Sequence, residues 1–355
     1  MAAEEDRVEA VEHGITRQLR DAITLRAALI MAGVLLLQLG FALSYMGAFH
    51  NPKPHNVPIT VVAPPAVAQQ LVGRLNALPG DPVHAVAVAD PADARQRLLN
   101  RDTDAAFLLN PTGQVDTLMI ASAGGPAAAS AATRVVQALE QAENRQVRID
   151  DIRPPAPGDN GGLSSFYLVL SWTIGGYLAA SALNMAAGSK KPTLPRTAVR
   201  VTSMLPYAFI SGIGGAIIVG PVLDCLPGAF WDLVGIGTLV VLASGVTAVA
   251  LQSVAGTIGL GITILVFTIL GNPSSGGVYP ASLLPPFWRA IGQALPPGAG
   301  TTVVRNTVYF DGAATTGALW VLGAWAFGGL LVAIVAAVVR DRRKPAAAPQ
   351  APVTV

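Results

Sequence analysis

The sequence is poor in charged residues, in histidine and in cysteine. Of its 355 residues, Lys, Arg, Asp and Glu make up 12%, whereas 52% are hydrophobic. This balance excludes a disordered chain, and a net charge of only +2 gives no reason to expect nucleic acid as a partner. The single cysteine, Cys225, cannot form an intramolecular disulfide, and all four histidines precede residue 85.

Sequence motifs of enzymes and cofactor sites are missing as well. The chain has no GxxxxGK[ST] loop for nucleotide phosphates, no GxGxxG loop, and no Cys/His spacing that would hold a metal. Its apolar half contains neither a histidine nor a pair of neighbouring carboxylates that could act as acid and base. We therefore expect no enzymatic activity, no cofactor and no metal site.

The few charges are unevenly placed, and long apolar runs fill the gaps between them. A bilayer core about 30 Å thick needs about 20 apolar residues per helix. Six stretches without Lys, Arg, Asp, Glu or His meet this length within a few residues: 27–49, 164–187, 201–223, 233–251, 254–271 and 317–339. They predict an α-helical polytopic membrane protein with six transmembrane helices in the lipid bilayer of the cell membrane.

The distribution of cations predicts the orientation. Twelve Lys or Arg residues lie before the first stretch, between the second and third, and after the sixth. With the long segment 50–163 left aside, because long domains cross the membrane largely regardless of charge, the opposite loops hold only Arg289 and Arg305. Because Lys and Arg accumulate on the cytoplasmic side, both termini are expected to be cytoplasmic, including the basic tail 340–355. Residues 50–163 are then extracytoplasmic.

Residues 50–163 read as a small α/β domain bounded by proline-rich linkers. Strands are expected at 59–62, 83–88, 105–109, 115–120 and 147–152, with helices after Pro65, after Pro91 with Asp90 as its cap, and over 126–144. The order βαβαββαβ predicts a two-layer α/β sandwich inserted between transmembrane helices one and two. With no catalytic motif, this domain is expected to bind or dock.

The residues before the first span suggest a helix on the membrane surface. Val8, Val11, Ile15 and Leu19 recur at helical spacing among polar residues, so 1–26 is predicted to form a cytoplasmic amphipathic interface helix. A solvated helical tail is the alternative.

Two features concern the membrane domain, 164–339. Gly212, Ala216 and Gly220 repeat at four-residue spacing, which allows close approach of another helix, either within the chain or across a homodimer. The second feature is the segment 272–310, where Asn272-Pro273 is expected to end span five and Pro285-Pro286 and Pro296-Pro297 bracket a helix too short to cross. Its apolar content favours a re-entrant or interfacial element over a solvated connector.

The arrangement and this segment resemble a known family. One span, an outer α/β domain, five further spans, and Asn272-Pro-Ser-Ser-Gly-Gly followed by Pro280, Leu284-Pro285, Phe287 and Leu295-Pro296 are similar to type-2 ABC exporter permeases, and more narrowly to the YhgE/Pip (phage-infection-protein) branch. The resemblance implies that residues 1–26 and the loop with Lys190, Lys191, Arg196 and Arg200 contact a separate nucleotide-binding ATPase subunit. It also implies an outer gate with these residues: Asn272, Pro273, Ser274, Ser275, Gly276, Gly277, Pro280, Pro285, Pro286, Phe287 and Trp288.

Two functions remain open from the sequence. The first is the permease subunit of an ABC-type exporter that moves hydrophobic or amphipathic compounds, drug-like or lipid-like, outward. Its spans contain no charge that could couple transport to protons, so the energy is expected from a separate ATPase. The alternative is a membrane scaffold or receptor whose outer domain binds a protein, phage or envelope component.

Overall fold

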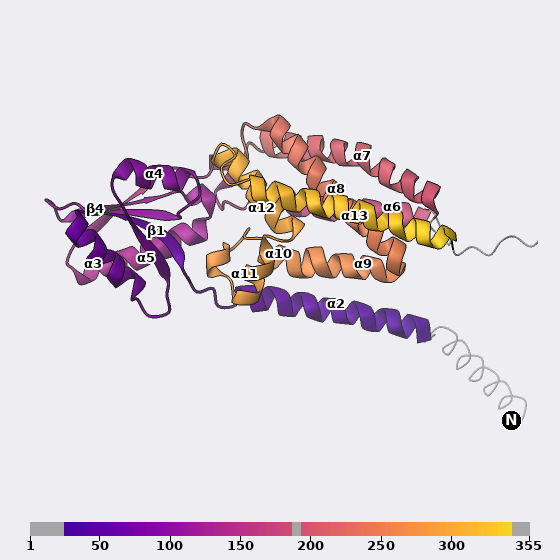
Figure 1. Ribbon diagram of the computed structural model, residues 1–355, viewed down its shortest axis with the longest axis horizontal. Helices are drawn as coiled ribbons and strands as arrows, with labels where there is room; N and C mark the ends of the chain where they lie inside the picture. Colours follow the sequence, from indigo (N-terminus) through magenta and orange to yellow (C-terminus); the bar gives the residue numbers. More distant parts are fainter. Residues whose placement is uncertain (1–24, 187–192, 343–355) are drawn as a thin grey trace, which may run out of the picture.

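The protein has an α/β domain at one end and an elongated bundle of helices at the other (Figure 1). The structure, a computed structural model, describes residues 25–186 and 193–342. The interface helix expected before residue 25, Lys190, Lys191 and the tail from residue 343 onward lie outside the described residues.

In chain order, the elements of the α/β domain stand between α2 (Leu25–Phe49) and α6 (Ser164–Ala186). Its expected order of elements is confirmed, with β1 (Val57–Val62), α3 (Pro65–Asn76), β2 (Val83–Val88), α4 (Pro91–Leu99), β3 (Ala105–Leu108), β4 (Val115–Ile120), α5 (Pro126–Ala142) and β5 (Gln146–Asp151). Asp90 caps α4 as expected, since its side chain accepts the Asp93 N–H at 2.9 Å.

The sheet has the order β2-β1-β3-β4-β5, and only the β3 and β4 pair is antiparallel. The expectation of two layers is wrong, because helices cover both faces: α3 and α5 pack on one, α4 on the other. The reason lies in the strand order. The crossover from β1 to β2 and the one from β2 to β3 run in opposite directions across the sheet, so two right-handed crossovers must use opposite faces.

Six described helices are long and apolar enough to cross a membrane. They are α2 (Leu25–Phe49), α6 (Ser164–Ala186), α7 (Leu194–Ile217) with its π-helical continuation η3 (Ile218–Val222), α8 (Phe230–Ala255), the combined span five, and α13 (Thr316–Arg342). Span five consists of α9 (Thr257–Ile264), the π-helical η4 (Leu265–Leu270) and α10 (Gly271–Ser274). The helix α8 is central, with 78% of its most apolar window buried, whereas α2 has only 6% buried and lies at the margin against η4 and α10.

The third span begins earlier than its uncharged stretch indicated. Helix α7 starts at Leu194, so Arg196 and Arg200 lie on its first two turns instead of in a loop. Pro195 does not prevent this start, because the first turn of a helix needs no N–H donor. Arg196 is exposed at the surface, whereas Arg200 is buried.

Between span five and α13 the chain forms short elements beside the α/β domain. These are the 3₁₀ turn η5 (Ala281–Leu283), α11 (Pro286–Gly292) and α12 (Pro296–Tyr309). Both short helices begin with proline, as the sequence indicated, and neither is among the six helices long enough to span.

Candidate gate segment

The Asn272-Pro273 pair does not end span five, contrary to the expectation from proline's effect on the preceding residue. Both residues are buried inside α10, which continues to Ser274. A helical proline leaves the carbonyl four residues earlier without its usual donor, here that of Ile269. The Ser44 hydroxyl of α2 donates to this Ile269 carbonyl at 2.5 Å. Tertiary contact thus satisfies the group that the proline leaves open.

Ser44 also connects this site to α11. The Trp288 indole N–H donates to the Ser44 hydroxyl at 3.2 Å, so one side chain joins α2, span five and α11. Gly47, one turn further along α2, provides the space for the indole, since a Cβ there would lie 2.8 Å from the Trp288 ring. Sequence reasoning selected Trp288 but missed Ser44, whose only signal was a hydroxyl within an otherwise apolar run.

The remaining residues expected in the gate divide by burial. Asn272, Pro273, Ser274, Ser275 and Gly277 are buried, Gly276, Pro280, Pro285 and Trp288 are partly buried, and Pro286 and Phe287 are exposed. The segment therefore has an inner part packed in protein and an outer part, Pro286 and Phe287, on the surface. Such irregular backbone fits membrane depth only where protein or a cavity surrounds it.

Arg305 of α12 holds the turn that follows α10. Its guanidinium donates to the carbonyls of Gly276 at 3.0 Å and Gly277 at 3.2 Å. Gly276 has a φ of +78°, in the region that favours glycine. Burial, reinforced by the positive charge of Arg101, lowers the pKa of Arg305 to about 10, so the side chain remains protonated at neutral pH. The sequence had marked Arg305 only as an outer-loop cation.

A second buried contact joins the linker after β5 to the end of α12. The Tyr309 hydroxyl donates to Asp159 Oδ2 at 2.8 Å, and the Ser164 N–H at the start of α6 donates to Asp159 Oδ1 at 2.9 Å. Burial, together with the hydrogen bond to Asp159, raises the pKa of the Tyr309 phenol above its ordinary value of 10.0. Both α6 and α12 are thus anchored on one carboxylate.

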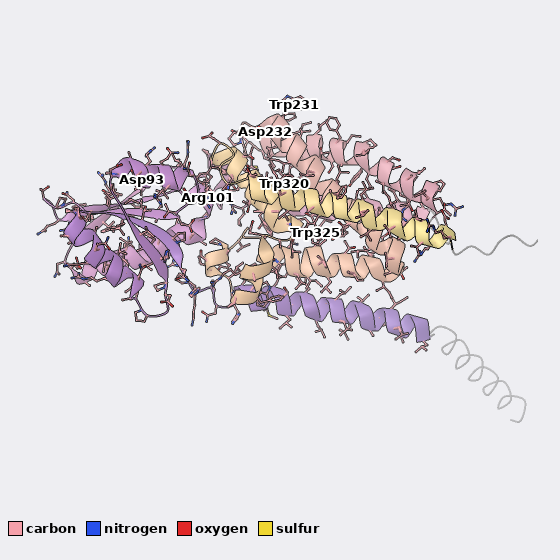
Figure 2. The ribbon with its side chains drawn as sticks, viewed as in Figure 1. Asp93, Arg101, Trp231, Asp232, Trp320 and Trp325 are labelled. Carbon is pink, nitrogen blue, oxygen red and sulfur yellow. The ribbon has the colours of Figure 1, made fainter. Side chains whose placement is uncertain are left out.

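The candidate gate segment, residues 272–310, reaches both faces of the sheet in the α/β domain. Leu283 of η5 is buried in the core beneath α3 and α5, whereas Phe310, just after α12, packs in the core beside α4. The Arg101 guanidinium lies 4.7 Å from the centre of the Phe310 ring, and Figure 2 shows Arg101 on the side of the domain nearest the bundle. Residues 272–310 therefore pack against the α/β domain on both sides of its sheet.

A surface hollow lies beside the gate segment. It has a volume of about 720 Å³ between the start of α8, the end of α12 and the start of α13. Trp231, Asp232 and Asp311 are among its lining residues, and Figure 2 places Trp231 and Asp232 on the outside of the bundle, toward the α/β domain.

Glycines of α7 bring the central helices close together. A Cβ on Gly212 would lie 2.5 Å from the Val234 carbonyl oxygen and 3.0 Å from the Thr238 hydroxyl of α8, Ala216 is buried, and a Cβ on Gly220 would have open space around it. The Trp172 indole of α6 lies between Gly215 and Gly237 and donates to the Ser211 carbonyl at 3.0 Å. Within the described residues, Gly212 thus packs inside the chain, and Trp172 joins α6, α7 and α8.

The described residues offer little that could bind a metal. Among residues 25–186 and 193–342, no group of three or more His, Cys, Asp or Glu side chains is arranged to hold a metal ion. Cys225 is buried and unpaired.

A family model described as "ABC-2 family transporter protein" matches residues 26–337, which covers the α/β domain, five candidate spans and most of the sixth. A search of curated proteins found no match.

Proposed function

Because the chain belongs to the ABC-2 family of transporters, we propose that it is the permease subunit of an exporter of hydrophobic or amphipathic compounds, driven by a separate ATPase. Membership of the family makes it a multi-pass membrane component of a transporter. The outward direction, the class of substrate, the ATPase and the narrower YhgE/Pip-like assignment are parts of the proposal.

The placement of charge supports an external source of energy. In the described spans, charged side chains occur only near the ends, such as Arg200 in α7, Asp232 in α8 and Arg340 in α13. Proton- or ion-coupled carriers depend on ionisable groups at the midplane, where an unpaired charge is costly. Hydrolysis of ATP by a partner requires no such group.

The contacts of the candidate gate segment support the proposal that the permease opens at the end of the bundle next to the α/β domain. The segment links α2 through Ser44 and Trp288, and it links the α/β domain through Leu283 and Phe310. A permease needs an element that can open on one side while the helix core remains packed. We assign this role to residues 272–310.

We assign contact with the ATPase to the opposite end of the bundle. Residues 1–26, Lys190, Lys191 and Arg196 form the proposed coupling surface together with the start of α7. The expected loop residue Arg200 is the exception, because its side chain faces the bundle interior.

The test is purification of the tagged full chain in mild detergent, followed by identification of bound proteins and an ATPase assay. We expect a stoichiometric nucleotide-binding subunit, and ATP-dependent movement of a fluorescent amphiphile in vesicles that contain both proteins. Arg196→Glu is expected to weaken the complex, with Arg95→Glu on the α/β domain as the matched control. Absence of any nucleotide-binding subunit would contradict the proposal and favour the scaffold or receptor alternative.

A further inference from the structure

A buried cation lies at the end of the bundle away from the α/β domain. Arg200 is only 8% exposed. It belongs to a face of α7 that repeats at helical spacing and points into the bundle, formed by Thr197, Arg200, Met204, Ala208 and Gly212. An arginine on this face stands where the next turns of the same helix carry only small or apolar side chains.

The packing of α7 on α8 shows what surrounds Arg200. A Cβ on Gly212 would meet Val234 and Thr238, and a Cβ on Gly245 would meet the Met204 methyl group, so the two helices run antiparallel. One and two turns further along, Arg200 and Thr197 therefore lie at the level of the α8 end that carries Gln252 and Ser253. Helix α6 joins at the same level, since Gln252 Nε2 donates to the Ser181 hydroxyl at 2.9 Å.

Polar atoms in this region are buried without partners. Arg200 Nε and Nη2 are buried and donate to no atom of the described residues, and Thr197 Oγ1, Gln252 Oε1 and Ser253 Oγ likewise have no hydrogen-bond partner there. None of the ion pairs within the described residues involves Arg200. At the same end of the bundle, Asp341 of α13 accepts the Leu194 N–H at 2.9 Å. A buried guanidinium without a counter-charge is strongly unfavourable, so an anion is expected.

We propose that Arg200, with Thr197, Gln252 and Ser253, binds a phosphate group between α6, α7 and α8. The planar guanidinium matches the oxygen geometry of phosphate, and the hydroxyl and amide groups supply further hydrogen bonds. Arg200 lies about 9 Å along α7 from its first residue, a depth that suits the headgroup of an anionic phospholipid. A free phosphate has the same chemistry.

The experiment measures thermal stability and ligand binding of the purified full chain in a neutral detergent. Phosphatidylglycerol, phosphatidylcholine and inorganic phosphate are added separately, and bound lipid is counted by native mass spectrometry. The variants are Arg200→Gln and Arg200→Lys. Arg340→Gln is the matched control, because Arg340 is an exposed cation at the same end that donates to the Val254 carbonyl.

We expect phosphatidylglycerol, but not phosphatidylcholine, to stabilise the wild type and Arg340→Gln. Arg200→Gln should bind it about tenfold more weakly or worse, the loss typical of a charge-assisted hydrogen bond, and Arg200→Lys should bind with intermediate strength. Equal stabilisation by inorganic phosphate would identify the free anion as the ligand. No response of the wild type to either ligand, or equal losses in Arg200→Gln and Arg340→Gln, would overturn the proposal. Because the wild type alone can give the negative result, the test does not depend on the folding of a variant or on the ATPase.

Discussion

Single side chains in this protein complete hydrogen bonds that connect elements far apart in the sequence. The Ser44 hydroxyl donates to the Ile269 carbonyl, which Pro273 leaves without a backbone donor, and accepts the indole N–H of Trp288. The Arg305 guanidinium donates to the carbonyls of Gly276 and Gly277 in the turn after α10. Away from water, a backbone carbonyl without a donor is costly. Small changes at such residues should therefore have effects larger than their size suggests.

We predict that Ser44→Ala lowers the stability of the protein by about 1 to 2 kcal/mol, because it leaves the Ile269 carbonyl and the Trp288 N–H unpaired together. Thermal unfolding in detergent, followed by tryptophan fluorescence, measures the change. Ser203→Ala is the control, since the exposed Ser203 hydroxyl only donates to the Val199 carbonyl of its own helix. Equal melting temperatures for the two variants would contradict the role of Ser44.

The contact of Trp172 with α7 leads to a second prediction, in which alanine substitutions at two neighbouring glycines, Gly215 and Gly214, have different effects on stability. A Cβ on Gly215 would lie about 2.5 Å from the Trp172 indole, whereas Gly214 has nothing within 4 Å. Gly215→Ala should destabilise the bundle by about 1 to 3 kcal/mol through overpacking. Gly214→Ala should be neutral or slightly stabilising, because alanine is the better helix former. Melting temperatures that fall equally in both variants would show that the indole does not limit the space.

At the scale of elements, the sequence predicted where most helices and strands begin and end, but not how each of them packs. Alternating apolar residues between proline and glycine breakers marked the strands, and uncharged length marked the spans. The face covered by α4 was missed because it follows from strand order, which the local pattern does not contain. The early start of α7 was missed because Arg196 and Arg200 interrupted an uncharged run, although two turns of helix can carry charge near a membrane surface.

An acidic pair, Asp116 of β4 and Glu140 of α5, predicts a pH dependence in the α/β domain. Asp116 is buried, with Arg145 Nε at 2.6 Å from its Oδ2, and Glu140 Oε2 lies 3.8 Å from the same nitrogen. Burial, together with the hydrogen bond and charge of Asp116, raises the pKa of Glu140 from 4.5 to about 8. Between these pH values the native state holds a proton that the unfolded chain has lost, so this group reduces stability as pH rises from about 4.5 to 8.

Glu140→Gln removes this dependence, because glutamine does not ionise. We expect the melting temperature of the variant to match the wild type near pH 5 and to exceed it increasingly toward pH 8. The control is Glu143→Gln, which removes the surface ion pair with Arg74. A constant difference between Glu140→Gln and wild type across this pH range would mean that Glu140 ionises in the native protein.

At the scale of the whole molecule, the contacts between the α/β domain and the bundle could not be read from one sequence. Asp159 meets Tyr309, and Arg101 meets Phe310, across 150 and 209 residues of chain. Each residue has an ordinary local context, such as a linker acid or a tyrosine near a helix end, and a single sequence contains no information about pairs. The buried arrangement around Arg305 was missed for the same reason.

The architecture makes the predicted orientation testable in intact cells. The described chain starts and ends at the bundle end farthest from the α/β domain (Figure 1), so the domain and the C-terminal side of α13 should face opposite sides of the membrane. The single native cysteine, Cys225, is buried and can be replaced by alanine. In that background we expect Arg95→Cys, on the exposed surface of α4, to react with a membrane-impermeant maleimide in intact cells. Ala348→Cys should react only after permeabilisation, and the reverse result would place the α/β domain and the proposed gate on the cytoplasmic side.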